Sequence, residues 1–186
     1  MRRSPMLFRL IAPALVAATV QTIPANASYE DPTILTVEEP AGTIVGQYHI
    51  DRLRSDFENV TIETRTPWTG EGELTQYRGP RIGAILHQHG LNSGRSVQFV
   101  AYDNFVSEVT IEEIDSYDPI FAIERACNDD DRASGRCNTD QEFTPLVPSE
   151  QGPIFLVWPY EQLPPYYVPA RNSIWVWFVV AVRPVE

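Results

Sequence analysis

The feature that most constrains the fold of this chain is a succession of short strand-like segments separated by proline and glycine breaks. Four of them alternate apolar and polar side chains or are rich in β-branched residues: residues 33–38 (TILTVE), 59–64 (NVTIET), 97–103 (VQFVAYD) and 107–111 (SEVTI). Three more are almost wholly apolar, as buried strands are: residues 119–124 (PIFAIE), 154–158 (IFLVW) and 174–182 (IWVWFVVAV). We expect the last of these to be a central strand.

Helical patterns are few and short. Residues 48–55 have Ile50 and Leu53 at helical spacing, and residues 112–116 fit a single turn. A further helix is expected to open at Gly79-Pro80 and close at Gly90, since proline suits the first helical position and glycine the end. Without repeats or a regular βαβ alternation, the pattern predicts an α+β domain with a mixed or antiparallel sheet core and a few short helices.

The first 27 residues have the features of a secretory signal peptide. Three arginines precede or interrupt an apolar run, and Ala25-Asn26-Ala27 is a small-x-small cleavage site. The mature chain, residues 28–186, is expected to be a single domain in the periplasm or outside the cell. An uncleaved anchor is the alternative, but the apolar run is short for a membrane span.

Charge and composition exclude several classes of protein. The formal net charge is −11, and cleavage after Ala27 would remove three arginines and no acids. Such an acidic surface argues against a nucleic-acid partner, which demands basic patches. The chain has no lysine, which excludes a lysine Schiff base and a P-loop. The HExxH zinc motif is also absent.

Two cysteines, Cys127 and Cys137, bracket an acidic loop. In an exported chain they are most simply a disulfide, which the chain-entropy model values at roughly 3 kcal/mol for so short a loop. A redox-active or metal-binding thiol pair is the alternative. The acidic run 129–131 does not have the spacing of an EF-hand calcium loop, and a solvated loop is expected instead.

Five stretches, in order, resemble the molybdopterin-binding domain of the sulfite oxidase family, and in particular its small exported members. They are IDRLRSDFENVTIETRTPW, QYRGPRIGAILHQHG, VQFVAYDNF, GPIFLVWPY and SIWVWFVVAV, and the resemblance extends over roughly residues 33–184, nearly the whole mature chain. The resemblance implies a sulfite-oxidase-like fold and a pterin or molybdopterin pocket.

The chain departs from that family at its metal ligand. Active members carry a molybdenum-binding cysteine about four residues before the corner tryptophan, and here that position falls near Thr64. A hydroxyl cannot replace a soft thiolate, so no molybdenum is expected. The family's Asn-Asp-Tyr corner reads Asp103-Asn104-Phe105 here. We therefore lean against an enzyme and assign no catalytic residue.

The resemblance implies a cofactor site where two corners converge. A pterin needs aromatic faces for stacking and polar groups to bind its edge. The predicted cofactor-binding residues are Thr64, Thr66, Trp68, Asp103, Asn104 and Phe105. Two of these assignments have a simpler reading, with Trp68 as core and Asp103-Asn104 as a turn that ends a strand.

The other aromatic residues favour different roles. Trp158, Trp175 and Trp177 are expected in the core, with Trp175 and Trp177 on one face of the last strand. Tyr160, Tyr166 and Tyr167 lie in a proline-rich irregular segment and are a candidate partner surface, or alternatively pack on a sheet edge.

Three functions follow as hypotheses. The first is an exported pterin-binding protein that serves as the ligand-sensing partner of a membrane signalling enzyme of the cyclic di-GMP type, through that enzyme's periplasmic domain. The second is a molybdopterin-dependent oxidoreductase with atypical metal ligation. The third is an interaction module that kept only the fold.

Overall fold

A β-hairpin opens the described part of the chain. The computed structural model describes residues 29–185, so the predicted signal peptide lies outside the described residues. Strands β1 (Ile34–Glu38) and β2 (Ile44–His49) pair antiparallel from Ile34 opposite His49, with a register shift near Glu38. The strand predicted over residues 33–38 is thereby confirmed.

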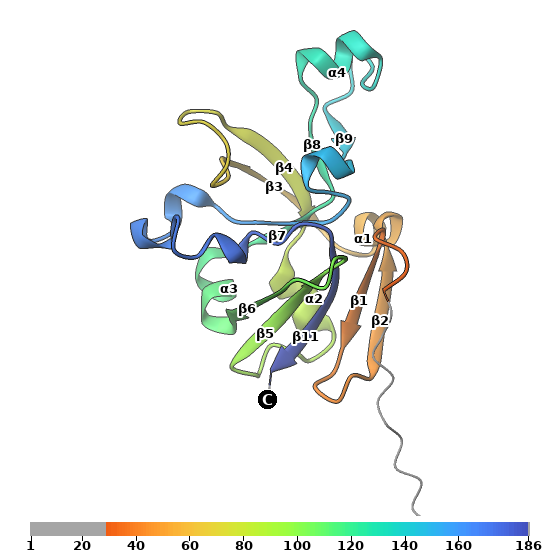
Figure 1. Cartoon of the computed structure of the whole chain (residues 1–186). Helices are drawn as coiled ribbons and strands as arrows, with labels where there is room; N and C mark the ends of the chain where they lie inside the picture. Colours follow the sequence, from red (N-terminus) through yellow and green to blue (C-terminus); the bar gives the residue numbers. More distant parts are fainter. Residues whose placement is uncertain (1–28, 186) are drawn as a thin grey trace, which may run out of the picture.

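The hairpin joins a five-stranded sheet with the order β2-β1-β11-β5-β6 (Figure 1). Strand β11 (Val179–Val185) lies between β1 and β5 (Ser96–Ala101), and β6 (Val106–Thr110) forms the far edge. The β1–β11 pair is parallel and the others are antiparallel, so this sheet is mixed.

A second, antiparallel sheet has the order β3-β4-β8-β9. Its strands are β3 (Asn59–Thr64), β4 (Thr75–Pro80), β8 (Glu124–Ala126) and β9 (Phe143–Pro145). A two-stranded ribbon pairs β7 (Ile120–Ala122) with β10 (Phe155–Val157). These sheets and the short helices give an α+β architecture, as predicted.

The described chain forms four short α-helices: α1 (Ile50–Asp56), α2 (Ile82–Gln88), α3 (Ile111–Tyr117) and α4 (Asp129–Ser134). Capping boxes start two of them, Thr110 with Glu113 at α3 and Asn128 with Asp131 at α4, and so satisfy backbone N–H groups that have no helical partner. Within residues 29–185 no helix has the length and apolar character needed to cross a membrane.

The core lies between the sheets. Phe99 of β5 packs edge-on against Phe121 of β7, with ring centroids 5.8 Å apart, and both are fully buried. Trp158, predicted as core, is also fully buried, and its Nε1–H donates to the carbonyl of Ile174 at 2.9 Å. A buried indole with a partner contributes a large apolar area at no polar cost.

The helix predicted from Gly79-Pro80 begins later than expected. Both residues belong to β4, where Gly79 lies opposite Val60 and Pro80 opposite Asn59, and α2 starts only at Ile82. Gly79 is required by close packing, because a Cβ atom there would lie 1.9 Å from the carbonyl oxygen of Phe121. The Gly-Pro pair has the pattern of a helix start, but Gly79 instead allows β4 to pack closely against β7.

The last strand is also displaced from its prediction. It spans Val179–Val185, whereas the segment before it forms a 3₁₀ turn (Asn172–Ile174) and an irregular stretch. Phe178 has a φ of 51°, a left-handed conformation that breaks the strand. The prediction that Trp175 and Trp177 share one strand face is therefore wrong. Trp177 is 38 % exposed.

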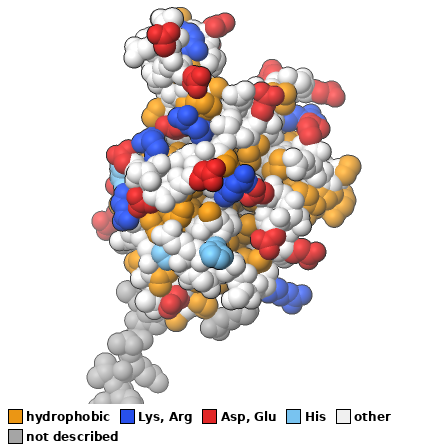
Figure 2. All heavy atoms as spheres, turned by 180° about the vertical axis from the view of Figure 1, so that it is seen from behind, with side chains coloured by type: hydrophobic (Ala, Val, Ile, Leu, Met, Phe, Trp, Pro, Cys, Tyr) orange, Lys and Arg blue, Asp and Glu red, His pale blue; other side chains and the backbone are white. Residues whose placement is uncertain are grey.

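The cysteine loop forms an arm at one end of the molecule, labelled α4 in Figure 1. The predicted disulfide between Cys127 and Cys137 is confirmed. The acidic run is a helix rather than the solvated loop we expected, because Arg125 binds both oxygens of the buried Asp131 at 2.5 and 2.9 Å. On the face shown in Figure 2, acidic and arginine side chains are interspersed.

Candidate functional site

The first wall of the candidate site is the turn that follows β3. The N–H of Trp68 donates to Oγ1 of Thr66 at 3.3 Å, and the N–H of Thr66 donates to Oγ1 of Thr69 at 2.8 Å. These side-chain bonds satisfy the backbone of a sharp turn and present the Trp68 indole outward, where it is 48 % exposed. The hydroxyl of the buried Thr66 thus accepts a hydrogen bond within the turn.

The second wall is the turn between β5 and β6. Oδ1 of Asp103 accepts the N–H of Phe105 at 3.0 Å, and the N–H of Asn104 donates to the Ala101 carbonyl at 2.9 Å. Asn104 has a φ of 68°, which asparagine tolerates better than most residues. This geometry matches the alternative reading of a strand-ending turn and also projects the Phe105 ring, which is 45 % exposed.

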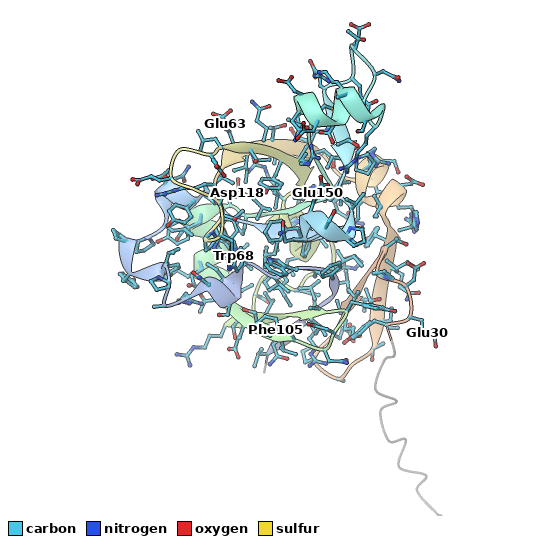
Figure 3. The ribbon with its side chains drawn as sticks, turned by 45° about the horizontal axis from the view of Figure 1, so that its top comes forward. Glu30, Glu63, Trp68, Phe105, Asp118 and Glu150 are labelled. Carbon is cyan, nitrogen blue, oxygen red and sulfur yellow. A yellow bond between two sulfur atoms is a disulfide. The ribbon has the colours of Figure 1, made fainter. Side chains whose placement is uncertain are left out.

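The third wall is the irregular stretch that precedes β11. The N–H of Tyr102 donates to the Phe178 carbonyl at 2.9 Å, which joins this stretch to the β5–β6 turn. The rings of Trp68 and Trp177 meet edge to face, with centroids 4.8 Å apart, and so join it to the β3–β4 turn. Three segments distant in sequence therefore converge, and Figure 3 labels Trp68 and Phe105 on two of them.

Between the three walls lies a cavity of about 370 Å³. It is lined mainly by aromatic rings and a few polar side chains: Trp68, Ala101, Asp103, Phe105, Asn172, Ser173, Trp175, Trp177 and Phe178. No arginine, lysine or histidine is among these lining residues. An apolar hollow with a few convergent polar groups is the usual form of a small-molecule site.

Two polar atoms of this lining are buried without a hydrogen-bond partner. They are Nε1 of Trp175, a donor, and Oδ1 of Asn172, an acceptor. Buried polar groups are almost always paired, and an unpaired one costs about 1–3 kcal/mol. Of the three buried side-chain polar atoms without a partner that the described residues contain, two belong to residues that line this cavity.

The structure brings three of the predicted site residues to the cavity, namely Trp68, Asp103 and Phe105. Thr64 and Thr66 do not line it, and neither does Asn104. The hydroxyl of Thr64 is engaged elsewhere, since it donates to the Arg65 carbonyl at 3.0 Å and accepts the Tyr160 N–H at 2.9 Å. Its role is to fasten the end of β3.

Sequence reasoning missed Asn172, Ser173, Trp175, Trp177 and Phe178 as site residues. The two tryptophans were expected in the core because their apolar run was read as one strand. The signal that could have found them is local: an Arg-Asn-Ser cluster, typical of a turn, interrupts the pattern just before the tryptophans.

The three tyrosines of the predicted partner surface lie in different environments. Tyr166 is 70 % exposed and Tyr160 is half-buried beneath the Arg65 guanidinium. Tyr167 is buried, and its hydroxyl donates to Oε1 of Glu113 at 2.6 Å. Burial raises the pKa of Tyr167. Tyr167 therefore fixes the loop in place and is not part of an exposed surface.

A hollow of about 450 Å³ beside β1 and β2 has a different character. Its lining is Tyr29, Glu30, Asp31, Ile34, Thr36, Ile44 and Gln47. It has one aromatic residue, and the Tyr29 hydroxyl already donates to Glu38 at 2.7 Å. The aromatic cavity is therefore the better candidate for a ligand.

The donor set offers nothing like the molybdenum ligand of the sulfite oxidase family. Both cysteines are joined in the disulfide beside α4, and the hydroxyl at the family's ligand position is engaged as described. In residues 29–185 no cluster of three or more histidine, cysteine or carboxylate side chains is arranged to hold a metal ion. These residues do not fit that family's metal.

No family model and no curated protein matches this chain.

Proposed function

We propose that this chain is an exported binding protein for a flat heteroaromatic ligand of the pterin class, held in the aromatic cavity. The observation that carries the proposal is a hollow walled by aromatic rings, two of whose lining residues, Trp175 and Asn172, carry a buried polar atom without a partner. A pterin presents acceptors and donors on its edge and two π-faces, so it could satisfy both atoms while stacking.

The ligand has to displace side chains to reach these atoms, because neither is exposed to solvent in the present conformation. Trp68 and Trp177 are exposed members of the lining, so their displacement costs little core packing. We therefore expect binding to be accompanied by a small rearrangement of the outer tryptophans.

Charge favours a pterin without phosphate. The one ionisable side chain of the lining is the Asp103 carboxylate. A phosphate group, as in molybdopterin, would lie near this anion without a cationic partner in the lining, which is unfavourable in a partly dry site. Unphosphorylated pterins are the class that the cavity suits best.

The remaining features of the proposal come from the resemblance. They are a sulfite-oxidase-like fold and ligand-dependent contact with the periplasmic domain of a membrane signalling enzyme. The proposed periplasmic or secreted location rests instead on the signal-peptide pattern of residues 1–27. Loss of the thiolate ligand supports binding without molybdenum chemistry. An interaction module without a ligand is the alternative, and the exposed aromatic residues around the cavity also suit that role.

The proposal is tested by calorimetric titration of the full chain with neopterin and with neopterin monophosphate. Quinoxaline, a flat ring without the amino and carbonyl edge, is the control ligand. We expect binding of neopterin, weaker binding of the phosphate, and none of quinoxaline. Trp68→Ala should weaken the affinity for neopterin about five- to hundredfold, the range for loss of one stacking ring. Tyr166→Ala, outside the cavity, should leave this affinity unchanged. Absence of neopterin binding to the folded protein would refute the proposal.

A further inference from the structure

A second groove runs along the outer edge of β3. This strand is the last in its four-stranded sheet and pairs only with β4 among the described strands. The pairing is continuous, from Asn59 opposite Pro80 to Thr64 opposite Thr75. One side of the β3 backbone therefore lacks a partner strand.

The lining of the groove shows that it lies beside the strand edge. It has a volume of about 340 Å³ and touches four successive residues, Val60, Thr61, Ile62 and Glu63. Successive side chains of a strand point to opposite faces of the sheet, so a hollow on one face would touch alternate residues. Contact with all four places the hollow along the edge, next to the backbone.

This edge lacks several of the features that usually protect a strand from pairing with another chain, although the segment 159–162 lines the same groove and the Tyr160 N–H donates to Thr64 at the end of β3. The β3 sequence, NVTIET, contains no proline or lysine, and its register has no bulge. The opposite edge of the same sheet is different, because β9 has three residues and ends at Pro145. The exposed edge of β3 is thus available for strand addition.

The groove carries excess negative charge. Its charged groups are Glu63, Asp118 and Arg81, beside the neutral phenol of Tyr117, and Arg81 forms an ion pair with Asp118. Glu63 is exposed and accepts a hydrogen bond from the neutral amide of Gln76 at 3.0 Å. Figure 3 labels Glu63 and Asp118, which come from β3 and from the end of α3. A cationic partner complements this site, whereas a second copy of the chain would bring a second Glu63 to it.

We propose that β3 is a docking edge for an extended segment of a partner protein that carries arginine or lysine, added as a further strand next to Val60–Glu63. The proposal does not depend on the pterin cavity. It nevertheless connects the two sites, since β3 leads within four residues to Trp68, and an added strand would act on one wall of the cavity.

The probe is a fluorescein-labelled octapeptide of alternating arginine and valine, titrated against the full chain by anisotropy. Two matched peptides are its controls, one with glutamate in place of arginine and one with alternate backbone nitrogens methylated. Glu63→Arg is the test variant. Glu71→Arg makes the same charge change at an exposed position outside the groove.

We expect the basic peptide to bind and the methylated peptide to bind about tenfold more weakly, because it lacks the ladder donors. Glu63→Arg should lose about two- to fivefold in affinity, the range for one exposed ion pair, and Glu71→Arg less. Amide hydrogen exchange should slow at alternate residues of β3. The proposal is overturned if the peptide fails to bind, if it protects another strand edge, or if the chain pairs with itself through β3.

Discussion

Replacing each of two buried tryptophans by phenylalanine should change the free energy of unfolding by clearly different amounts. Trp158 and Trp175 are 0 % and 3 % exposed, so each replacement removes a similar amount of buried ring. They differ at the indole nitrogen. Nε1 of Trp158 donates to the Ile174 carbonyl, whereas Nε1 of Trp175 has no partner.

The size of the difference follows from the cost of unpaired polar groups. Trp158→Phe leaves a buried carbonyl without its donor, which costs about 1–3 kcal/mol beyond the lost packing. Trp175→Phe removes a donor that was already unpaired and regains a similar amount. The free energy of unfolding of Trp175→Phe should therefore exceed that of Trp158→Phe by at least about 2 kcal/mol.

The assay is urea unfolding followed by far-ultraviolet circular dichroism, which does not depend on the tryptophans removed. The linear-extrapolation slopes of the two variants must agree for the comparison to hold. Equal stabilities, or a less stable Trp175→Phe, would show that the Trp175 nitrogen is already satisfied in the free protein. In that case Trp175 has no unpaired donor for a ligand to satisfy.

Three further predictions concern two glycines, one buried carboxylate and the disulfide. Gly79→Ala should destabilise by more than about 3 kcal/mol, because its Cβ would meet the Phe121 backbone. Gly83→Ala in α2 would make an ordinary van der Waals contact with Ile114 and should stabilise by about 0.5–1 kcal/mol; thermal unfolding distinguishes the two variants. Hydrogen bonds from Arg125 lower the pKa of Asp131. The ionised Asp131 carboxylate therefore stabilises the folded protein above the unfolded pKa of about 3.9, and this stabilisation is lost as the pH falls further. The Asp131→Asn variant should thus be less stable than the unmodified protein at pH 7, and its free energy of unfolding should fall less on acidification. Reducing the disulfide should lower the free energy of unfolding by roughly 3 kcal/mol, measured with and without reductant.

The strands were predictable where local pattern and tertiary environment agree. The β3 segment NVTIET was expected over residues 59–64, and the structure has it at these residues. Alternation in such a segment reports one buried and one exposed face, which the sheet then provides. The short helices after β2 and β6 were also expected, with bounds shifted by one or two residues.

The candidate site was only partly predictable, because uniform apolar composition does not distinguish a buried strand from a buried loop. The run of residues 174–182 reported burial correctly at Trp175, yet its strand begins at Val179. Nothing in the sequence indicated the positive φ of Phe178 that turns the chain away from the ladder. The cavity wall built by Asn172 and Trp175 depends on that turn, so it was missed.

Pterin binding at Trp175 is tested most directly by following the indole N–H signals in a ¹H–¹⁵N correlation spectrum while neopterin is added. The four tryptophans give one indole signal each. If a ligand edge accepts from Trp175 Nε1, its signal should move downfield and its hydrogen exchange should slow, while the signal of Trp158 stays fixed by its bond to Ile174. If neopterin leaves the Trp175 signal in place, or moves all four signals alike, the cavity is not the pterin site.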